Sequence, residues 1–197
     1  MAAQNLSIIK NLLAQHMAVV EQLHNNTYLI QQIQTAIDYC VKAANAGQKI
    51  LFCGNGGSAS DCQHIATELT IRFKKDRPAI AAIALTTDTS ALTAAGNDLG
   101  FDRIFSRQVE ALGQPGDILI GFSTSGNSAN VIRAFEEAKR RDLTTVFLGG
   151  GTGGALADIA DVSLIVPSTV TAHIQECHIM MGHIICEGLE TSLGYAT

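Results

Sequence analysis

Two short segments combine glycine, amide and hydroxyl groups in a way that suits phosphate binding. The first is Gly54-Asn55-Gly56-Gly57-Ser58, whose glycines permit a tight turn and let backbone N–H groups approach an anion at the start of a helix. The second is Ser123-Thr124-Ser125-Gly126-Asn127-Ser128, which directly precedes a helix expected to begin near Ala129. Hydroxyl and amide donors at a helix N-terminus satisfy phosphate oxygens with help from the helix dipole. Both segments are therefore predicted to bind a phosphate group.

Simpler interpretations of the two segments remain open. The first segment could be a glycine turn that joins a strand to a helix, with Ser58 as the N-cap. The second could be a capping turn with Ser128 as the N-cap. That interpretation leaves the hydroxyls of Ser123, Thr124 and Ser125 without a role.

A dinucleotide site is a further alternative for the first segment. Gly54, Gly56 and Ala59 fit the loose pattern G-x-G-x-x-G/A. That pattern expects an acidic residue about 20 residues further on. That residue should end the second strand, and the nearest candidate there, Asp88, lies 34 residues after Gly54. The hydroxyl-rich segment also has no role in such a fold. We therefore favour a phosphate site over a dinucleotide site.

His64 and Glu68 are candidates for acid–base chemistry. Their spacing places an imidazole and a carboxylate on one face of the helix that should follow the glycine segment. Such a pair is often only an exposed helix contact, and it gains interest here from the phosphate loops beside it.

The elements that must position these residues follow from hydrophobic patterning. Apolar residues at three- and four-residue steps predict a helix over residues 6–23, and a second should run over residues 28–46 until Gly47. Near-continuous apolar runs predict buried strands at residues 49–53, 80–85, 118–122, 144–148 and 162–166. A last helix is expected over residues 172–193. Alternation of buried strands and helices predicts an α/β fold, a doubly wound five-stranded parallel sheet with flanking helices and two added N-terminal helices.

Composition narrows the class of protein. The 197 residues, 47% hydrophobic with a net charge of −5, fit a single globular domain over residues 1–197. We expect a cytoplasmic protein, because the chain opens without a signal peptide and lacks an apolar run of about 20 residues. The five cysteines form no C-x-x-C pair and should be free thiols. No membrane or nucleic acid partner is expected, and the patch Arg72, Lys74, Lys75 and Arg77 should be a solvated helix end.

The two phosphate loops resemble the sugar isomerase (SIS) family of phosphosugar-binding modules. Further segments are similar to the members that act on seven-carbon sugar phosphates: residues 63–69, 86–88, 96–98, 123–131 and 174–176 with His183. The resemblance implies reversible aldose–ketose interconversion of D-sedoheptulose 7-phosphate and D-glycero-D-manno-heptose 7-phosphate, an early step of heptose biosynthesis for bacterial lipopolysaccharide. It also implies a homotetramer, in which residues 1–46 serve oligomerisation and residues 47–197 form the phosphosugar-binding core.

The resemblance also assigns roles to single residues. It implies that Glu68 and His183 are catalytic, and that zinc is bound by His64, Glu68, Gln175 and His183. Gln175 and His183 are separated by about 12 Å along an ideal helix, so reaching one ion would need an irregular start of that helix. The substrate-binding residues that the family pattern implies are Asn55, Gly56, Gly57, Ser58, Glu68, Arg72, Asn97, Asp98, Ser123, Thr124, Ser125, Ser128 and Gln175.

Two other functions fit parts of the pattern. Some relatives are non-catalytic adaptors that bind the bacterial replication initiator, and those lose the catalytic pair. A sugar-phosphate-sensing module would keep the loops and need no acid–base residues. Because Glu68 and His183 are both present, we favour an enzyme.

Overall fold

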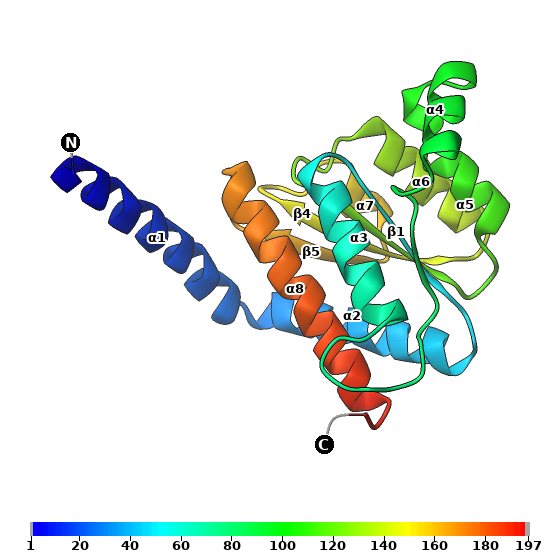
Figure 1. Ribbon diagram of the computed structural model, residues 1–197, viewed down its shortest axis with the longest axis horizontal. Coiled ribbons are helices and arrows are strands. Elements are labelled where there is room, and N and C mark those ends of the chain that lie inside the picture. Colours follow the sequence, from blue (N-terminus) through cyan, green and yellow to red (C-terminus); the bar gives the residue numbers. More distant parts are fainter. Residues whose placement is uncertain (1, 196–197) are drawn as a thin grey trace.

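The computed structural model describes residues 2–195, with side chains described from residue 6 onward. It is a three-layer α/β fold in which helices cover both faces of one sheet (Figure 1). The helices are α1 (Ala2–His24), α2 (Thr27–Asn45), α3 (Gly57–Thr70), α4 (Thr89–Asp98), the 3-10 turn η1 (Phe101–Arg103), α5 (Ser106–Leu112), α6 (Ala129–Arg140), α7 (Leu156–Ile159) and α8 (Thr171–Ser192). The strands are β1 (Ile50–Gly54), β2 (Ala82–Ala84), β3 (Ile118–Ser123), β4 (Thr144–Gly150) and β5 (Val162–Val166).

The sheet has five parallel strands in the order β2-β1-β3-β4-β5, which confirms the predicted doubly wound architecture. Alternate side chains of each strand enter two separate cores. Phe52 and Ile120 pack under α2, α3 and α8. Leu51 and Leu119 pack under α4, α5 and α6 on the other face. The strands are therefore apolar almost throughout, as buried parallel strands must be.

The expected elements are all present, and the limits of most of them differ from the prediction by a few residues. The strand predicted over residues 80–85 was too long, because it pairs only over Ala82–Ala84. It is an edge strand with β1 as its single neighbour, and Ile83 is accordingly exposed. Ser58 is not an N-cap, because α3 already begins at Gly57 and the cap residue is Gly56 with a positive φ of 57°.

Helix α1 extends away from the remainder of the molecule in Figure 1. Its apolar side chains are largely exposed, including Leu6 (59%), Leu13 (60%) and Met17 (68%). Among the described residues, no helix combines the length and hydropathy that crossing a bilayer requires. All five cysteines are free and buried, as predicted.

Candidate active site

The two predicted phosphate loops lie side by side at the carboxyl ends of β1 and β3. These strands are neighbours, and Gly54 pairs with Phe122 at the end of the ladder. The strand order changes direction at this point, which is where ligands bind in open α/β sheets. The segments that sequence patterning assigned to a phosphate are therefore close together.

A reciprocal amide pair joins the loops. The side chain of Asn55 donates to Oδ1 of Asn130 at 2.9 Å, and Asn130 donates back to Oδ1 of Asn55 at 2.8 Å. Asn130 is buried in the first turn of α6. One hydrogen of the Asn55 amide is used in this pair, and the other remains available to a ligand. Sequence reasoning included Asn130 in the segment 123–131 without giving it a role; an amide at a buried helix position was the available signal.

The hydroxyl-rich loop presents its donors at the start of α6. Ser128 is the N-cap residue of this helix, as predicted, but its hydroxyl is 3.0 Å from the hydroxyl of Ser123 and makes no capping bond. The backbone N–H of Asn127 donates to Oγ of Ser125 at 3.2 Å. Ser125 is exposed and Thr124 half-buried. Hydroxyls beside uncapped helix N–H groups are suited to an anion.

The segment that follows β4, residues 151–156, packs against the hydroxyl-rich loop. Gly126 has a φ of 66°, and a Cβ atom there would overlap the carbonyl oxygen of Gly153. The backbone N–H of Leu156 donates to the Gly126 carbonyl at 3.0 Å, and that of Ala155 to Oδ1 of Asn127 at 3.0 Å. Residues 153–156 thus fix the shape of the hydroxyl loop.

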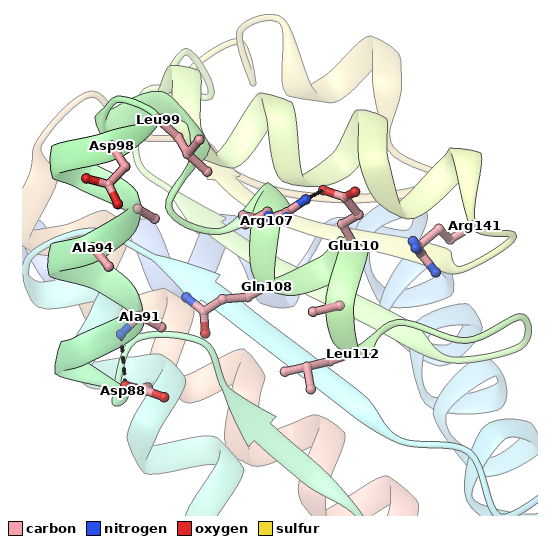
Figure 2. Close-up of a pocket in the computed structure, with 12 residues that line it drawn as sticks. Asp88, Ala91, Ala94, Asp98, Leu99, Arg107, Gln108, Glu110, Leu112 and Arg141 are labelled. Carbon is pink, nitrogen blue, oxygen red and sulfur yellow. Dashed lines mark hydrogen bonds and ion pairs between the residues drawn. The ribbon is translucent and has the colours of Figure 1, made fainter.

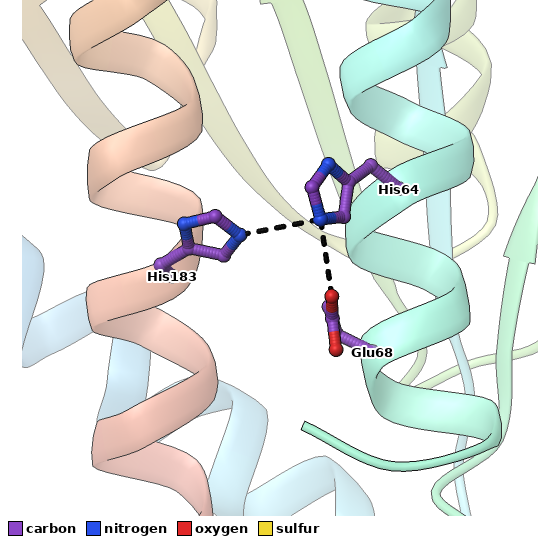
Figure 3. Close-up of side chains that lie close together, drawn as sticks. All are labelled: His64, Glu68 and His183. Carbon is purple, nitrogen blue, oxygen red and sulfur yellow. Dashed lines mark hydrogen bonds and ion pairs between the residues drawn. The ribbon is translucent and has the colours of Figure 1, made fainter. Parts of the chain in front are cut away.

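His64, Glu68 and His183 come together on one side of the sheet (Figure 3). On α3, Nε2 of His64 lies 3.0 Å from Oε1 of Glu68, which confirms that the two share a helix face. From α8, Nε2 of His183 lies 3.4 Å from Nε2 of His64. The three ligand atoms all lie within 4.8 Å of one another, so this cluster could hold a metal ion. Phe73 stacks on the His183 ring, with the centroids 5.5 Å apart.

Close packing of α3 against α8 produces this cluster. The two helices run side by side in the same direction in Figure 1. A Cβ atom at Gly182 would lie 2.7 Å from the side chain of Ile65, and one at Gly57 would lie 2.6 Å from Nε2 of Gln175. Glycine at these two positions therefore permits the close approach. Gln175 lies against the glycine loop, about two turns before His183 on a regular helix, so the irregular start considered above is not present.

Two titratable groups of the site have shifted pKa values. The pKa of His183 lies below its ordinary value, because partial burial and the neighbouring His64 disfavour the imidazolium more than Glu68 favours it. The pKa of Asp61 is raised by burial, an effect that His64 partly opposes. Among the described residues, Oδ2 of Asp61 is a buried oxygen without a hydrogen-bond partner. Asp61 stands one turn before His64 on α3, and sequence reasoning missed it.

The remaining predicted substrate residues lie on two other parts of the chain: Asn97 and Asp98 on α4, which packs on the opposite face of the sheet from α3 and α8, and Arg72 beside Phe73. Asn97 and Asp98 are at the end of α4, where the amide of Asn97 donates to the carboxylate of Asp98 at 2.7 Å. Asp98 lines a cavity of about 720 Å³ between α4 and α5, together with Arg107 and Glu110 (Figure 2). Arg72 is exposed and follows the end of α3.

The fold and these loops define a sugar-phosphate-binding α/β domain, and comparison with known proteins agrees. The SIS domain family model matches residues 13–150. The chain is 50% identical over 185 residues to the phosphoheptose isomerase of Sulfurimonas denitrificans, covering 94% of this chain and 95% of that one. It is 56% identical over 160 residues to that of Nitratiruptor, covering 81% and 86%. The structure of phosphoheptose isomerase from Neisseria gonorrhoeae superposes with a TM-score of 0.88 at 43% identity, covering 94% of this chain and 98% of that one. The chain belongs to the SIS domain family and, within it, to the phosphoheptose isomerases.

Proposed function

We propose that this chain interconverts D-sedoheptulose 7-phosphate and D-glycero-D-manno-heptose 7-phosphate through an enediol or enediolate. The observation that carries the proposal is the convergence of His64, Glu68 and His183, in a chain with near full-length similarity to phosphoheptose isomerases. This aldose–ketose isomerisation would supply heptose for surface polysaccharide. Adaptor and sensing functions would not need such a cluster.

The loops after β1 and β3 would hold the phosphate, which does not react. Backbone N–H groups of Gly56 and Gly57 and the hydroxyls of Ser123, Thr124, Ser125 and Ser128 would supply the donors, with Ser58 beside them, whose N–H donates to the Asn55 carbonyl. The N-terminus of α6 adds a favourable dipole. This grip fixes the position of the sugar, so that its carbonyl end extends toward the faces of α3 and α8.

Glu68 and His183 would move the protons. The Glu68 carboxylate would take the proton from the carbon next to the carbonyl and return it to the neighbouring carbon, while His183 transfers the proton between the two oxygens. The lowered pKa of His183 supports this role, because a neutral imidazole can accept a proton near pH 7. The contact between His64 and Glu68 orients the carboxylate.

We also propose that zinc binds to His64, Glu68 and His183. Two nitrogens that each bind a tetrahedral zinc ion at about 2.0–2.1 Å lie about 3.3–3.4 Å apart. The two Nε2 atoms lie 3.4 Å apart, and the donor set of two imidazoles and one carboxylate leaves an open position, as in catalytic sites. A bound zinc ion would polarise the substrate's oxygens as charge develops. Gln175 is the fourth ligand implied by the family pattern; because α8 is regular between Gln175 and His183 and the Gln175 amide lies at the start of α3, a substrate contact suits it better.

The assembly is proposed to be a homotetramer in the cytoplasm. The exposed apolar side chains of α1, such as Ile8, Ile9 and Leu12, support a role of residues 1–46 in subunit contacts. Asn97 and Asp98 would then approach a substrate across such contacts, since α4 packs on the other face of the sheet from α3 and α8. Arg72 would contact a substrate from the end of α3, next to Phe73.

The direct test is incubation of the purified protein with sedoheptulose 7-phosphate and detection of the aldose product by chromatography. We expect turnover by the wild-type protein and a large loss in Glu68→Gln. A folded wild-type protein that binds the sugar phosphate without converting it would contradict the isomerase proposal and favour a sensing module.

A further inference from the structure

Arg77 and Glu190 form an ion pair inside the protein, although the sequence placed Arg77 in a solvated patch. Nε of Arg77 lies 2.7 Å from Oε1 of Glu190. The two side chains are 0% and 3% exposed. That part of the sequence prediction was wrong, because the Arg77 side chain is buried against the last turn of α3. Burial of two charges is expensive unless every donor and acceptor finds a partner.

The Arg77 guanidinium makes its other hydrogen bonds to main-chain oxygens. Nη2 donates to the carbonyl of Glu68 at 2.8 Å. Nη1 donates to the carbonyls of Leu69 at 2.9 Å and Pro78 at 3.0 Å. Glu68 and Leu69 belong to the last turn of α3, whose carbonyls lack partners within the helix. A cation at a helix C-terminus also interacts favourably with the helix dipole.

Glu190 connects this contact to the second half of the proposed active site. It lies on α8 about two turns after His183, and this spacing places the two residues on nearly the same face of the helix. The second oxygen of Glu190 accepts a hydrogen bond from the backbone N–H of Lys74 at 3.3 Å. The pair therefore joins the main chain of Glu68 directly to the face of α8 that carries His183.

We infer that Arg77 is a positioning residue, which through Glu190 sets the separation of Glu68 from His183. The inference rests on the roles proposed for those two side chains. Stability alone is a weak explanation of the pair, because apolar residues of similar volume commonly stabilise a buried junction as well or better. The planar Arg77 guanidinium, in contrast, has donors in fixed directions. Its hydrogen bonds therefore specify one arrangement of α3 and α8. Misplacement of reacting groups by about 1 Å can lower a rate about 100-fold.

Arg77→Lys tests the inference, because it keeps the charge and removes the fork. A single ammonium cannot reach acceptors on Glu68, Leu69, Pro78 and Glu190 together. We expect kcat to fall about 10- to 100-fold while KM changes by less than about 3-fold, since the phosphate loops are at the other end of α3. A thermal melt would establish that the variant is folded at the assay temperature.

Lys49→Arg is the matched control. Lys49 pairs with the fully buried Asp117 at 2.6 Å, at the amino ends of β1 and β3 and away from the cluster. Lys49→Arg is the reverse of the exchange made at Arg77. It disturbs a buried ion pair in which neither partner belongs to α3 or α8. Its kcat should stay within about 2-fold of wild type, because distant independent sites do not couple.

A second variant covers the case in which Arg77→Lys does not fold. Arg77→Met combined with Glu190→Leu replaces the pair by apolar side chains and leaves no buried charge unpaired. A folded double variant should still lose kcat about 10-fold or more. Retention of more than about half of wild-type kcat by either folded variant would overturn the inference.

Glu68→Gln distinguishes this failure from failure of the proposed function. If Glu68→Gln loses activity while the folded Arg77 variants keep theirs, only the positioning role is wrong. If Glu68→Gln keeps its activity, the proposed chemistry itself is wrong, and the role of Arg77 falls with it.

Discussion

The strand-end loops and the α3–α8 helix pair are built on different principles. The loops present backbone N–H groups and short hydroxyls whose positions are set by glycine conformation and by neighbouring main chain, as at Gly126. The helix pair presents long titratable side chains whose relative positions depend on how two helices pack. Ground-state affinity and catalysis should therefore be separable: changes in the loops should alter KM, and changes in the helix pair should alter kcat.

The largest effect is expected at the helix pair, in Glu68→Gln and His183→Gln. Glutamine keeps the size of Glu68 and removes the basic carboxylate, so kcat should fall by about 10²–10⁴ with little change in KM. The two losses should not add in the double variant, because residues on one proton path fail as a unit. Steady-state turnover of sedoheptulose 7-phosphate with a parallel melt measures this. A folded Glu68→Gln protein with more than about a tenth of wild-type kcat would remove Glu68 as the base.

The complementary experiment removes hydroxyls from the loop. Thr124→Ala and Ser125→Ala should each raise KM about 10- to 150-fold, because each loses a hydrogen bond to a charged group worth about 1.5–3 kcal/mol. The value of kcat should be nearly unchanged, since the phosphate does not take part in the reaction. Thr93→Ala, an exposed hydroxyl removal on α4, is a control that should leave both constants as in wild type. An unchanged KM in the double loop variant would place the phosphate elsewhere.

The same contrast explains what the sequence could predict. The loops were identified because their residues are contiguous and because glycine and hydroxyl patterns report local conformation. The shared face of His64 and Glu68 followed from helix periodicity, whereas their contact with His183 spans 119 positions and was reached only through the family resemblance. Patterning also placed the strands to within a few residues and gave Val162–Val166 its observed limits.

The misses also have physical causes. Arg77 was assigned to solvent because arginine is rarely fully buried, and its partner Glu190 is remote in sequence. Ser58 was assigned as an N-cap because the positive φ of Gly56 could not be foreseen from composition. The hydrogen bonds between Asn55 and Asn130 form because the loops after β1 and β3 are neighbours. Only the strand order of the sheet determines which loops are neighbours.

The Asn55–Asn130 pair joins the two loops, and breaking it should have an effect of intermediate size on KM. Asn130→Ala removes both bonds of the reciprocal pair and leaves the partly buried amide of Asn55 without these partners. KM should rise about 5- to 10-fold, corresponding to about 1–1.5 kcal/mol, with kcat nearly unchanged. Asn130→Asp is the matched variant: it keeps the size of the side chain and one acceptor but adds a buried negative charge beside the phosphate loops, so its KM should rise more than that of the alanine variant. A fall in kcat with unchanged KM would break the proposed separation of the two regions.

The smallest effect on activity, and a specific effect on stability, is expected at His178, where the two regions meet. This histidine on α8 is fully buried, and its Nε2 lies 3.1 Å from the carbonyl oxygen of Gly149, in β4 just before the segment that packs against the hydroxyl-rich loop. Burial lowers the pKa of His178 to about 4, although the bond to Gly149 opposes the shift. Near pH 7 the side chain is therefore neutral in the folded protein, and Nε2 donates to the carbonyl.

The pH dependence of stability follows from that lowered pKa. Below about pH 6.5 the unfolded chain takes up a proton at this histidine, while the folded protein does not until about pH 4. The contribution of His178 to the free energy of unfolding is thus fully present above about pH 6.5. It is lost as the pH falls, by about 3 kcal/mol at pH 4.

His178→Gln, which does not titrate, should flatten the dependence of the unfolding free energy on pH by that amount. All other titrating groups are common to the two proteins and cancel in the comparison. Denaturant unfolding at a fixed protein concentration from about pH 7 to about pH 4 measures the difference. Parallel curves for wild type and His178→Gln would mean that His178 is solvated or already charged in the folded protein, and that α8 does not hold Gly149 through a neutral imidazole.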